Sequence, residues 1–238
     1  TMKLSFRWYG PDDKVTLENI RQIPGMHSIV TAVYDVPVGE VWSEESIAAL
    51  KKQVEDAGLH FEVIESIPVH EDIKLGKPSR DRYIENYCEN IRRVAKAGVK
   101  CICYNFMPVV DWTRTDLMQP LANGGYALRF DAVDFAAYDL FVLKRPRVED
   151  SYTGEQIAAA HQRFAGMDEA TIARIERNLI AGLPATERSF DRASFLAALA
   201  EYDGVTAETL HENLARFLRE IVPVAEEVGI RLCIHPDD

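Results

Sequence analysis

The stretch that decides the fold is RDRYIENYCENIRRVAKAGVKCICYNF, residues 80–106. Its first part predicts a helix over 80–98, because apolar side chains at every third or fourth position share one helical face. These side chains are Ile84, Tyr87, Ile91 and Val94. The β-branched and aromatic residues that follow predict a buried strand over 99–106. Gly98 suits the left-handed backbone that ends a helix before the chain enters a sheet.

The same helix–strand unit recurs on both sides of this stretch. Upstream, Ser43 offers a side-chain cap for a helix over 43–58, and a strand is predicted over 60–67. The remaining predicted elements are strands over 4–9, 28–34 and 230–235 and helices over 16–22 and 206–228. Strands that alternate with helices predict a parallel sheet covered by helices. The sequence has no GxGxxG or P-loop motif, which argues against the usual dinucleotide- and nucleotide-binding proteins.

Residues 109–205 interrupt this alternation, because they contain no strong strand pattern. They predict an aromatic loop over 111–138 and helical stretches that include 154–164 and 168–179. Such a segment is long for a connection between two elements, and no linker sets it apart from the rest of the chain. We therefore expect a helical insertion after the fourth strand, within a single barrel domain over 1–238.

The predicted strands end in polar or aromatic residues, and (β/α)8 barrels, or TIM barrels, build their active sites from such strand ends. Alternation along each strand places Arg7, Asn105 and His235 on one face, opposite apolar neighbours. A buried arginine or histidine is costly without a partner, so packing alone explains this convergence poorly. An open doubly wound sheet is the other possible arrangement. Since five strands cannot close an eight-stranded barrel, we expect the chain to be incomplete at its C-terminus, by about 100 residues.

Composition limits the classes of function. The net charge is −11, and no basic patch or stripe marks a nucleic-acid-binding protein. No apolar run approaches the length of about 18 residues that a membrane span needs. The four cysteines form no CxxC pair, and the N-terminus has no signal-peptide core. Both features predict free thiols in a reducing cytoplasm.

Three side chains offer binding chemistry. Imidazole is a common ligand of divalent metals, so His235 is a candidate metal ligand, and the carboxylates of Asp237 and Asp238 could orient its ring. Arg114 lies in a segment dense in polar groups and could clamp a carboxylate with two hydrogen bonds. His70 follows the third predicted strand, in an expected loop, and is a weaker candidate.

Several motifs, spread over the whole chain, together resemble those of the mannonate dehydratase family. They are FRWYG (6–10), ESIPVHEDIK (65–74), YNFMPV (104–109), DWTRT (111–115), IAGLP (180–184) and IHPDD (234–238). The resemblance implies a barrel of the xylose-isomerase-like superfamily. It also implies a carbon–oxygen lyase (hydro-lyase) of glucuronate catabolism, which dehydrates D-mannonate to 2-dehydro-3-deoxy-D-gluconate with Mn²⁺ or Fe²⁺.

The resemblance also assigns residues. His235 matches the first of the family's four metal ligands, whereas Cys233 does not match its cysteine ligand. The other ligands and the proton-transferring residues are expected beyond Asp238. Within the chain, the residues expected to bind the sugar acid are Arg7, Trp8, His70, Asn105 and Arg114. Apart from this small molecule, the partner we expect is a further copy of the chain, in a homo-oligomer.

Two other functions are compatible with the same residues. A sugar isomerase or epimerase of the same superfamily would also use a divalent metal, but the substrate would keep its hydroxyl group. A non-catalytic sugar-acid-binding protein would bind the ligand without turnover. Formation of a 2-keto-3-deoxy acid distinguishes the dehydratase from both.

Overall fold

The computed structural model describes residues 2–180 and 190–236. The chain divides into two compact units, one made of Thr1–Pro108 and Gly204–Asp238 and the other of Val109–Asp203. We expected one domain with an insertion over 109–205. The inserted segment has almost those boundaries, and it forms a compact unit with hydrophobic cores of its own.

The first unit contains a parallel sheet with the strand order β1-β2-β3-β4-β7. Its strands are β1 (Leu4–Arg7), β2 (Met26–Thr31), β3 (His60–Glu65), β4 (Cys101–Tyr104) and β7 (Arg231–Ile234). Its helices are α1 (Leu17–Arg21), α2 (Glu44–Asp56), α3 (Glu71–Leu75), α4 (Arg80–Lys96) and α9 (Ala207–Val228). At least one helix connects each pair of neighbouring strands, as the sequence predicts.

Local sequence signals set the ends of these helices. Thr16, Ser43 and Thr206 are the N-caps of α1, α2 and α9, and the side chain of each accepts a hydrogen bond from a backbone N–H of the first turn. Gly58 and Gly98 follow α2 and α4 with φ angles of 77° and 98°, a left-handed conformation that glycine adopts without a steric cost. The boundaries predicted for α1, α2, α4 and α9 are confirmed to within two residues.

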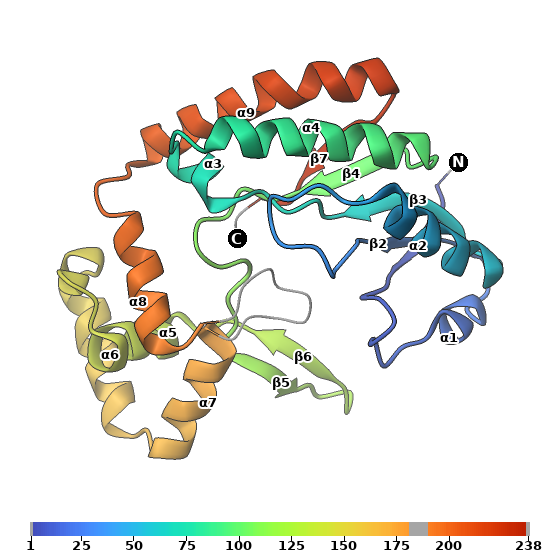
Figure 1. The fold of residues 1–238 in the computed structure, drawn as a ribbon. Coiled ribbons are helices and arrows are strands. Elements are labelled where there is room, and N and C mark those ends of the chain that lie inside the picture. Colours follow the sequence, from blue (N-terminus) through green and yellow to red (C-terminus); the bar gives the residue numbers. More distant parts are fainter. Residues whose placement is uncertain (1, 181–189, 237–238) are drawn as a thin grey trace. The chain divides into compact units, whose positions relative to one another are not determined.

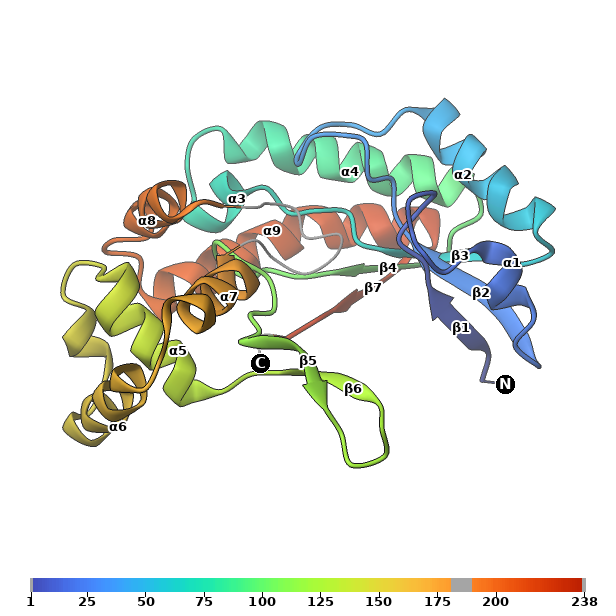
Figure 2. The same ribbon diagram turned by 90° about the horizontal axis from the view of Figure 1, so that it is seen from below.

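One face of the sheet is covered by helices. A single hydrophobic core joins the strands to α1, α2, α4 and α9, and Figures 1 and 2 show α4 and α9 side by side over that face. On the opposite face, Ser5 and Ser28 share a hydrogen bond of 2.6 Å between their hydroxyl groups. Helices on one face only are the arrangement of part of a TIM barrel, whereas a doubly wound sheet carries helices on both faces. The predicted fold class is confirmed.

Two predictions for the first unit differ from the structure. The strands are shorter than predicted, because their C-terminal residues leave the sheet and enter loops. The loop expected around His70 contains the helix α3 instead. His70 is its N-cap, and Nδ1 of its ring accepts a hydrogen bond of 3.0 Å from the backbone N–H of Asp72. In the part of the chain that the structure describes, no helix has the length and apolarity needed to cross a membrane.

The second unit contains a β-hairpin where the sequence shows no strong strand pattern, so the loop predicted over 111–138 is wrong. Its strands β5 (Asp116–Pro120) and β6 (Tyr126–Arg129) pair antiparallel and are joined by a turn that contains Gly124. The predicted helices over 154–164 and 168–179 are confirmed as α6 and α7. The helical elements are α5 (Ala132–Tyr138), the π-helical turn η1 (Asp139–Leu143), the 3₁₀ turn η2 (Val148–Ser151), α6 (Gly154–Ala165), α7 (Glu169–Ile180) and α8 (Arg192–Glu201).

A buried carboxylate joins η1 to η2 in this unit. Asp139 accepts hydrogen bonds from Nε and Nη2 of Arg145, at 2.9 and 3.0 Å, and from the hydroxyl group of Tyr152, at 2.8 Å. Burial and the hydrogen bond to Asp139 raise the pKa of Tyr152 well above its usual range, so its hydroxyl group stays a neutral donor. A buried carboxylate oxygen without a hydrogen-bond donor costs free energy of desolvation. The three donated bonds of this network offset that cost for Asp139.

Replacing Asp139 by asparagine is expected to destabilise the second unit by about 2 kcal/mol, because the buried carboxylate is lost and the half-buried guanidinium group of Arg145 loses its charged partner. Urea unfolding followed by tryptophan fluorescence and circular dichroism measures the change. The matched control is Asp150→Asn, which breaks an exposed ion pair with Arg147 and should shift the free energy of unfolding by less than about 0.5 kcal/mol. Equal effects of the two substitutions would contradict this account.

Candidate active site

Three polar side chains converge at the C-terminal ends of the strands in the first unit. Glu65 ends β3, Arg7 ends β1, and His235 follows β7. Nε2 of His235 lies 2.7 Å from Oε1 of Glu65, and Nε of Arg7 lies 4.0 Å from Oε2 of the same carboxylate. The inward convergence predicted for Arg7 and His235 is thus confirmed, with Glu65 as the group that connects them.

Aromatic rings hold the guanidinium group of Arg7. Its Cζ atom lies 4.9 Å from the ring centroid of Tyr9 and 6.0 Å from that of Tyr34, within the range of cation–π attraction. Burial raises the pKa of Tyr34, and its hydroxyl group donates to the carbonyl oxygen of Trp8. Nη1 of Arg7 is buried and has no hydrogen-bond partner among the described residues. Nη1 of this guanidinium group, which binds anions strongly, is therefore a donor that a bound anion could engage.

Glu65 was missed as a site residue, although its position at a strand end is visible in the sequence. Strand register explains its role, because Glu65 on β3 pairs with Cys103 on β4, which in turn pairs with Cys233 on β7. That row lies directly below His235, the second residue after Cys233. A sequence shows that a carboxylate ends a strand, but it does not show which strands are neighbours.

Three thiols lie below this cluster on the same face of the sheet. Sγ of Cys101 lies 3.5 Å from Sγ of Cys233, and Cys103 pairs with Cys233 across β4 and β7. The prediction of free thiols is confirmed for all four cysteines, since Cys88 is also unpaired. Cys88 and Cys103 are buried, Cys101 is half-buried and Cys233 is exposed.

Cys101 is expected to react unusually slowly with alkylating reagents. Partial burial, reinforced by Cys233, raises its pKa to about 11, and only the thiolate reacts. At pH 8 its thiolate fraction is therefore about a hundredfold lower than that of an ordinary thiol. Iodoacetamide labelling of Cys101, quantified by peptide mass spectrometry, should accelerate about tenfold for each pH unit between 8 and 10. In urea the same cysteine should react at the ordinary rate, and fast reaction of the folded protein at pH 8 would show that the burial is absent.

Asn105 lies where the sequence places it, but its contacts are local. It follows β4 and is buried, and its side-chain oxygen accepts a hydrogen bond of 3.3 Å from the backbone N–H of Met107. The same loop is held by the buried ammonium group of Lys74, which donates to the carbonyl oxygen of Met107 at 2.8 Å and to Glu71 at 3.0 Å. Lys74 was not singled out in the sequence, because its spacing is that of an ordinary surface lysine.

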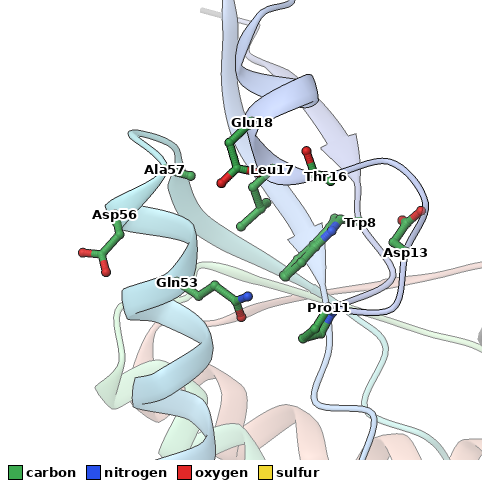
Figure 3. Close-up of a pocket in the computed structure, with 9 residues that line it drawn as sticks. All are labelled: Trp8, Pro11, Asp13, Thr16, Leu17, Glu18, Gln53, Asp56 and Ala57. Atoms are coloured by element: carbon green, nitrogen blue, oxygen red, sulfur yellow. The ribbon is translucent and has the colours of Figure 1, made fainter.

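Trp8 does not join Arg7, Glu65 and His235. Its indole is buried in the core of the first unit, on the opposite face of the strand from Arg7. It lines a pocket of about 370 Å³ together with Leu17 of α1 and Gln53 of α2, as Figure 3 shows. Strand alternation already placed Trp8 opposite Arg7, and its observed role is in core packing, whereas its binding of a sugar acid stays a prediction.

Two further candidate residues make contacts with other groups of their own units. His70 stacks its ring on that of Tyr83, with centroids 3.7 Å apart, and caps α3. Arg114 belongs to the second unit, where its Nη1 donates to the carbonyl oxygen of Thr113 at 2.8 Å. Asp237 and Asp238, expected to orient His235, lie outside the described residues, as do residues 181–184 of the IAGLP motif.

The strand-end residues fit a divalent metal in kind and supply part of a site. Imidazole nitrogen and carboxylate oxygen are both suitable donors for an ion such as Mn²⁺, and His235 and Glu65 offer one each. A catalytic metal site commonly uses three protein ligands. Over residues 2–180 and 190–236, no group of three or more histidine, cysteine, aspartate or glutamate side chains is placed to hold a metal ion.

Comparison with known proteins gives one consistent result. A model of the D-mannonate dehydratase (UxuA) family matches residues 2–238. Mannonate dehydratases of Chromohalobacter salexigens and Saccharophagus degradans are 50% and 47% identical to the chain over 237 residues. The matches cover all of this chain but 60% and 59% of those proteins, so the chain spans about three fifths of the length of these relatives.

The fold is also similar to a solved structure. The crystal structure of mannonate dehydratase from Streptococcus suis serotype 2 matches with a TM-score of 0.72 and 44% sequence identity. The match covers the whole of this chain and 54% of that one. A match of the family model over nearly every residue, with relatives at about half identity, leaves one assignment: the chain belongs to the mannonate dehydratase family.

Proposed function

We propose that the full-length protein that contains this chain is a D-mannonate dehydratase, which eliminates water from D-mannonate to give 2-dehydro-3-deoxy-D-gluconate. The observation that carries the proposal is the arginine–glutamate–histidine cluster at the C-terminal ends of β1, β3 and β7. In barrel enzymes this edge of the sheet holds the active site. The names of the relatives supply the substrate, and the cluster supplies groups that suit a sugar acid.

Arg7 is the proposed binding group for the carboxylate of the substrate. Its guanidinium group is fixed by Tyr9 and Tyr34, and its buried Nη1 has no partner among the described residues. A carboxylate could accept from this nitrogen, and a second donated bond would make the contact bidentate. Binding of the carboxylate at Arg7 would direct C2 and C3 of the sugar acid towards Glu65 and His235.

His235 is the proposed metal ligand of this chain, and Mn²⁺ or Fe²⁺ is the proposed ion. When bound, such an ion offsets the negative charge that develops when a proton leaves the carbon next to a carboxylate. Glu65 holds the imidazole ring of His235 through Nε2, either as an orienting partner or as a further ligand. The remaining ligands, and the groups that transfer protons at C2 and at the C3 hydroxyl, are assigned by the family resemblance to residues that follow Asp238.

The test is an assay of the full-length protein with D-mannonate, before and after removal of metal with a chelator and after addition of Mn²⁺ or Fe²⁺. A 2-keto-3-deoxy acid that forms only with metal supports the proposal. An epimeric sugar acid or a ketose with the hydroxyl group retained would instead support the isomerase or epimerase. A thermal shift with D-mannonate and no product would support a non-catalytic binding protein.

The proposed setting is hexuronate catabolism in the cytoplasm, with a small sugar acid as the substrate. The free thiols of Cys101 and Cys233 favour a reducing compartment, because two sulfur atoms 3.5 Å apart would readily form a disulfide in an oxidising one. The reaction that supplies the substrate must produce a six-carbon aldonic acid, and the reaction that consumes the product must accept a 2-keto-3-deoxy acid.

A further inference from the structure

A buried lysine lies at the same edge of the sheet as the candidate site. Lys74 belongs to α3, the helix that follows the C-terminal end of β3, and its side chain is exposed by only 2%. Its ammonium group donates hydrogen bonds to the carbonyl oxygen of Met107, at 2.8 Å, and to Oε1 of Glu71, at 3.0 Å. Lysine is almost never fully buried without such partners, because its charge loses its hydration.

Stability alone explains this lysine poorly. A buried ion pair gains little over well-packed apolar side chains, since desolvation of the two charges offsets most of their attraction. A buried polar contact can instead specify one geometry of the groups that it joins. Here the ammonium group joins the segment that follows β4 to α3. The helix α3 is in turn held by α9, where Nδ2 of Asn213 donates to the carbonyl oxygen of Lys74 at 2.9 Å (Figure 1).

The backbone of Met107 connects Lys74 to Asn105. Its carbonyl oxygen accepts from Lys74, and its N–H donates to Oδ1 of Asn105 at 3.3 Å. This second bond engages the amide oxygen of Asn105, so Nδ2 remains as the donor end of the side chain. Asn105 is exposed by only 8%, and its Nδ2 has no hydrogen-bond partner within residues 2–180 and 190–236. This amide donor is therefore available to a ligand.

Asn105 follows β4 directly beside the proposed metal ligand. Tyr104 at the end of β4 pairs with Ile234 at the end of β7, and the backbone N–H of His235 donates to the carbonyl oxygen of Tyr104 at 2.8 Å. Asn105 and His235 are thus the next residues along two paired parallel strands. The contacts that fix Asn105 consequently act on the same strand ends that carry the candidate site.

We propose that Lys74 is a positioning residue of this site, which fixes the segment 105–108 so that the amide of Asn105 donates to an oxygen of the sugar acid. The inference rests on the proposed function, because the sugar acid is the ligand. Asn105 touches the ligand, and Lys74 acts on it through the backbone of Met107. A displacement of about 1 Å at a group that orients a substrate can lower the rate about 100-fold.

The test compares Lys74→Met with Lys51→Met in the full-length protein. Methionine retains most of the apolar stem and removes the ammonium group. Lys51 is the matched control, because its Nζ makes the same kinds of contact before β4 begins: it donates to the carbonyl oxygen of Ala97 at 2.9 Å and lies 3.8 Å from Oε1 of Glu55. Lys74→Met should lower kcat/KM for D-mannonate at least about tenfold with its metal retained, whereas Lys51→Met should stay within about twofold of the wild type.

Two further measurements separate positioning from a general loss of stability. Hydrogen exchange at the backbone N–H of Met107, followed by mass spectrometry of peptides that contain it, should accelerate at least about tenfold in Lys74→Met and stay unchanged in Lys51→Met. The double variant Lys74→Met with Asn105→Ala should have a kcat/KM within about twofold of that of Asn105→Ala alone, because the two residues act through one chain of contacts. A lower melting temperature with unchanged kcat/KM would show that Lys74 only stabilises the fold, and would overturn the proposal.

The variant Asn105→Ala tests the proposal even if Lys74→Met does not fold. A kcat/KM of Asn105→Ala within about twofold of the wild type would overturn it. Equal effects of the two lysine substitutions, or additive effects in the double variant, would do the same. A wild type that does not dehydrate D-mannonate would instead refute the proposed function. Faster exchange at Met107 in Lys74→Met would then still support the role of Lys74 in fixing this segment.

Discussion

Replacing His235 by alanine in the full-length protein is expected to remove bound metal and to lower turnover of D-mannonate at least about 1,000-fold. A lost ligand reduces metal affinity directly, and the remaining ligands no longer complete the coordination shell. The carboxylate of Glu65, 2.7 Å from Nε2 of His235, also loses its partner. Metal content after dialysis, measured by mass spectrometry of the elements, reports the effect without relying on activity.

The matched control for this substitution is His60→Ala. His60 begins β3, at the opposite end of the strand from Glu65, and stacks on His27 with ring centroids 4.2 Å apart. It should retain metal and turnover within about twofold of the wild type, since surface substitutions away from a site have small effects. If His235→Ala kept its Mn²⁺ after dialysis, His235 would not be a ligand, whatever happened to turnover.

The fold was predictable because its signals are local. The cap at Ser43, the glycines at 58 and 98 and the apolar stripe around Ile91 each specify one helix or its end. Alternation of helix and strand then limits the arrangement of the sheet. A barrel and an open sheet differ in whether helices cover one face of the sheet or both. That difference depends on how several separate helices pack, which no single local signal specifies.

The hairpin could not be predicted in the same way. Its strands are short, and the exposed side carries Tyr126 and Leu128, so the alternation of apolar and polar residues that identifies a solvated strand points to the wrong face. The helix α3 was missed for a different reason. Its five residues are too few to show a helical period, and its cap is the ring of His70, which is not among the usual capping residues.

The candidate site was predictable only in part. Strand alternation correctly directed Arg7 and His235 inwards, because alternation belongs to each strand by itself. The partnership with Glu65 depends on β3 lying between β1 and β7 in the same sheet, which is a property of the whole fold. Trp8 was assigned to the site by its place in a family motif, although strand alternation directs it to the other face, where the structure places it in the core.

Replacing Arg7 by alanine is expected to lower kcat/KM for D-mannonate about 1,000-fold, which corresponds to about 4 kcal/mol of transition-state stabilisation. The guanidinium group supplies a charge-assisted contact in a largely buried position, where its Nη1 has no partner among the described residues. Arg7→Lys should recover only part of the loss, because an ammonium group cannot form the planar two-pronged contact. Steady-state kinetics over a range of substrate concentrations separates the effects on KM and kcat.

The control for Arg7 is Arg82→Ala, which removes an exposed arginine that pairs with Glu40 at 2.7 Å on the outer layer. It should change kcat/KM by less than twofold, because exposed ion pairs contribute little even to stability. Since Arg7 also lies beside Glu65, its removal could disturb the position of His235. The metal content of Arg7→Ala separates the two roles. If the variant keeps its metal but loses kcat/KM, Arg7 binds the carboxylate of the substrate. If it loses its metal as well, Arg7 instead supports the metal site.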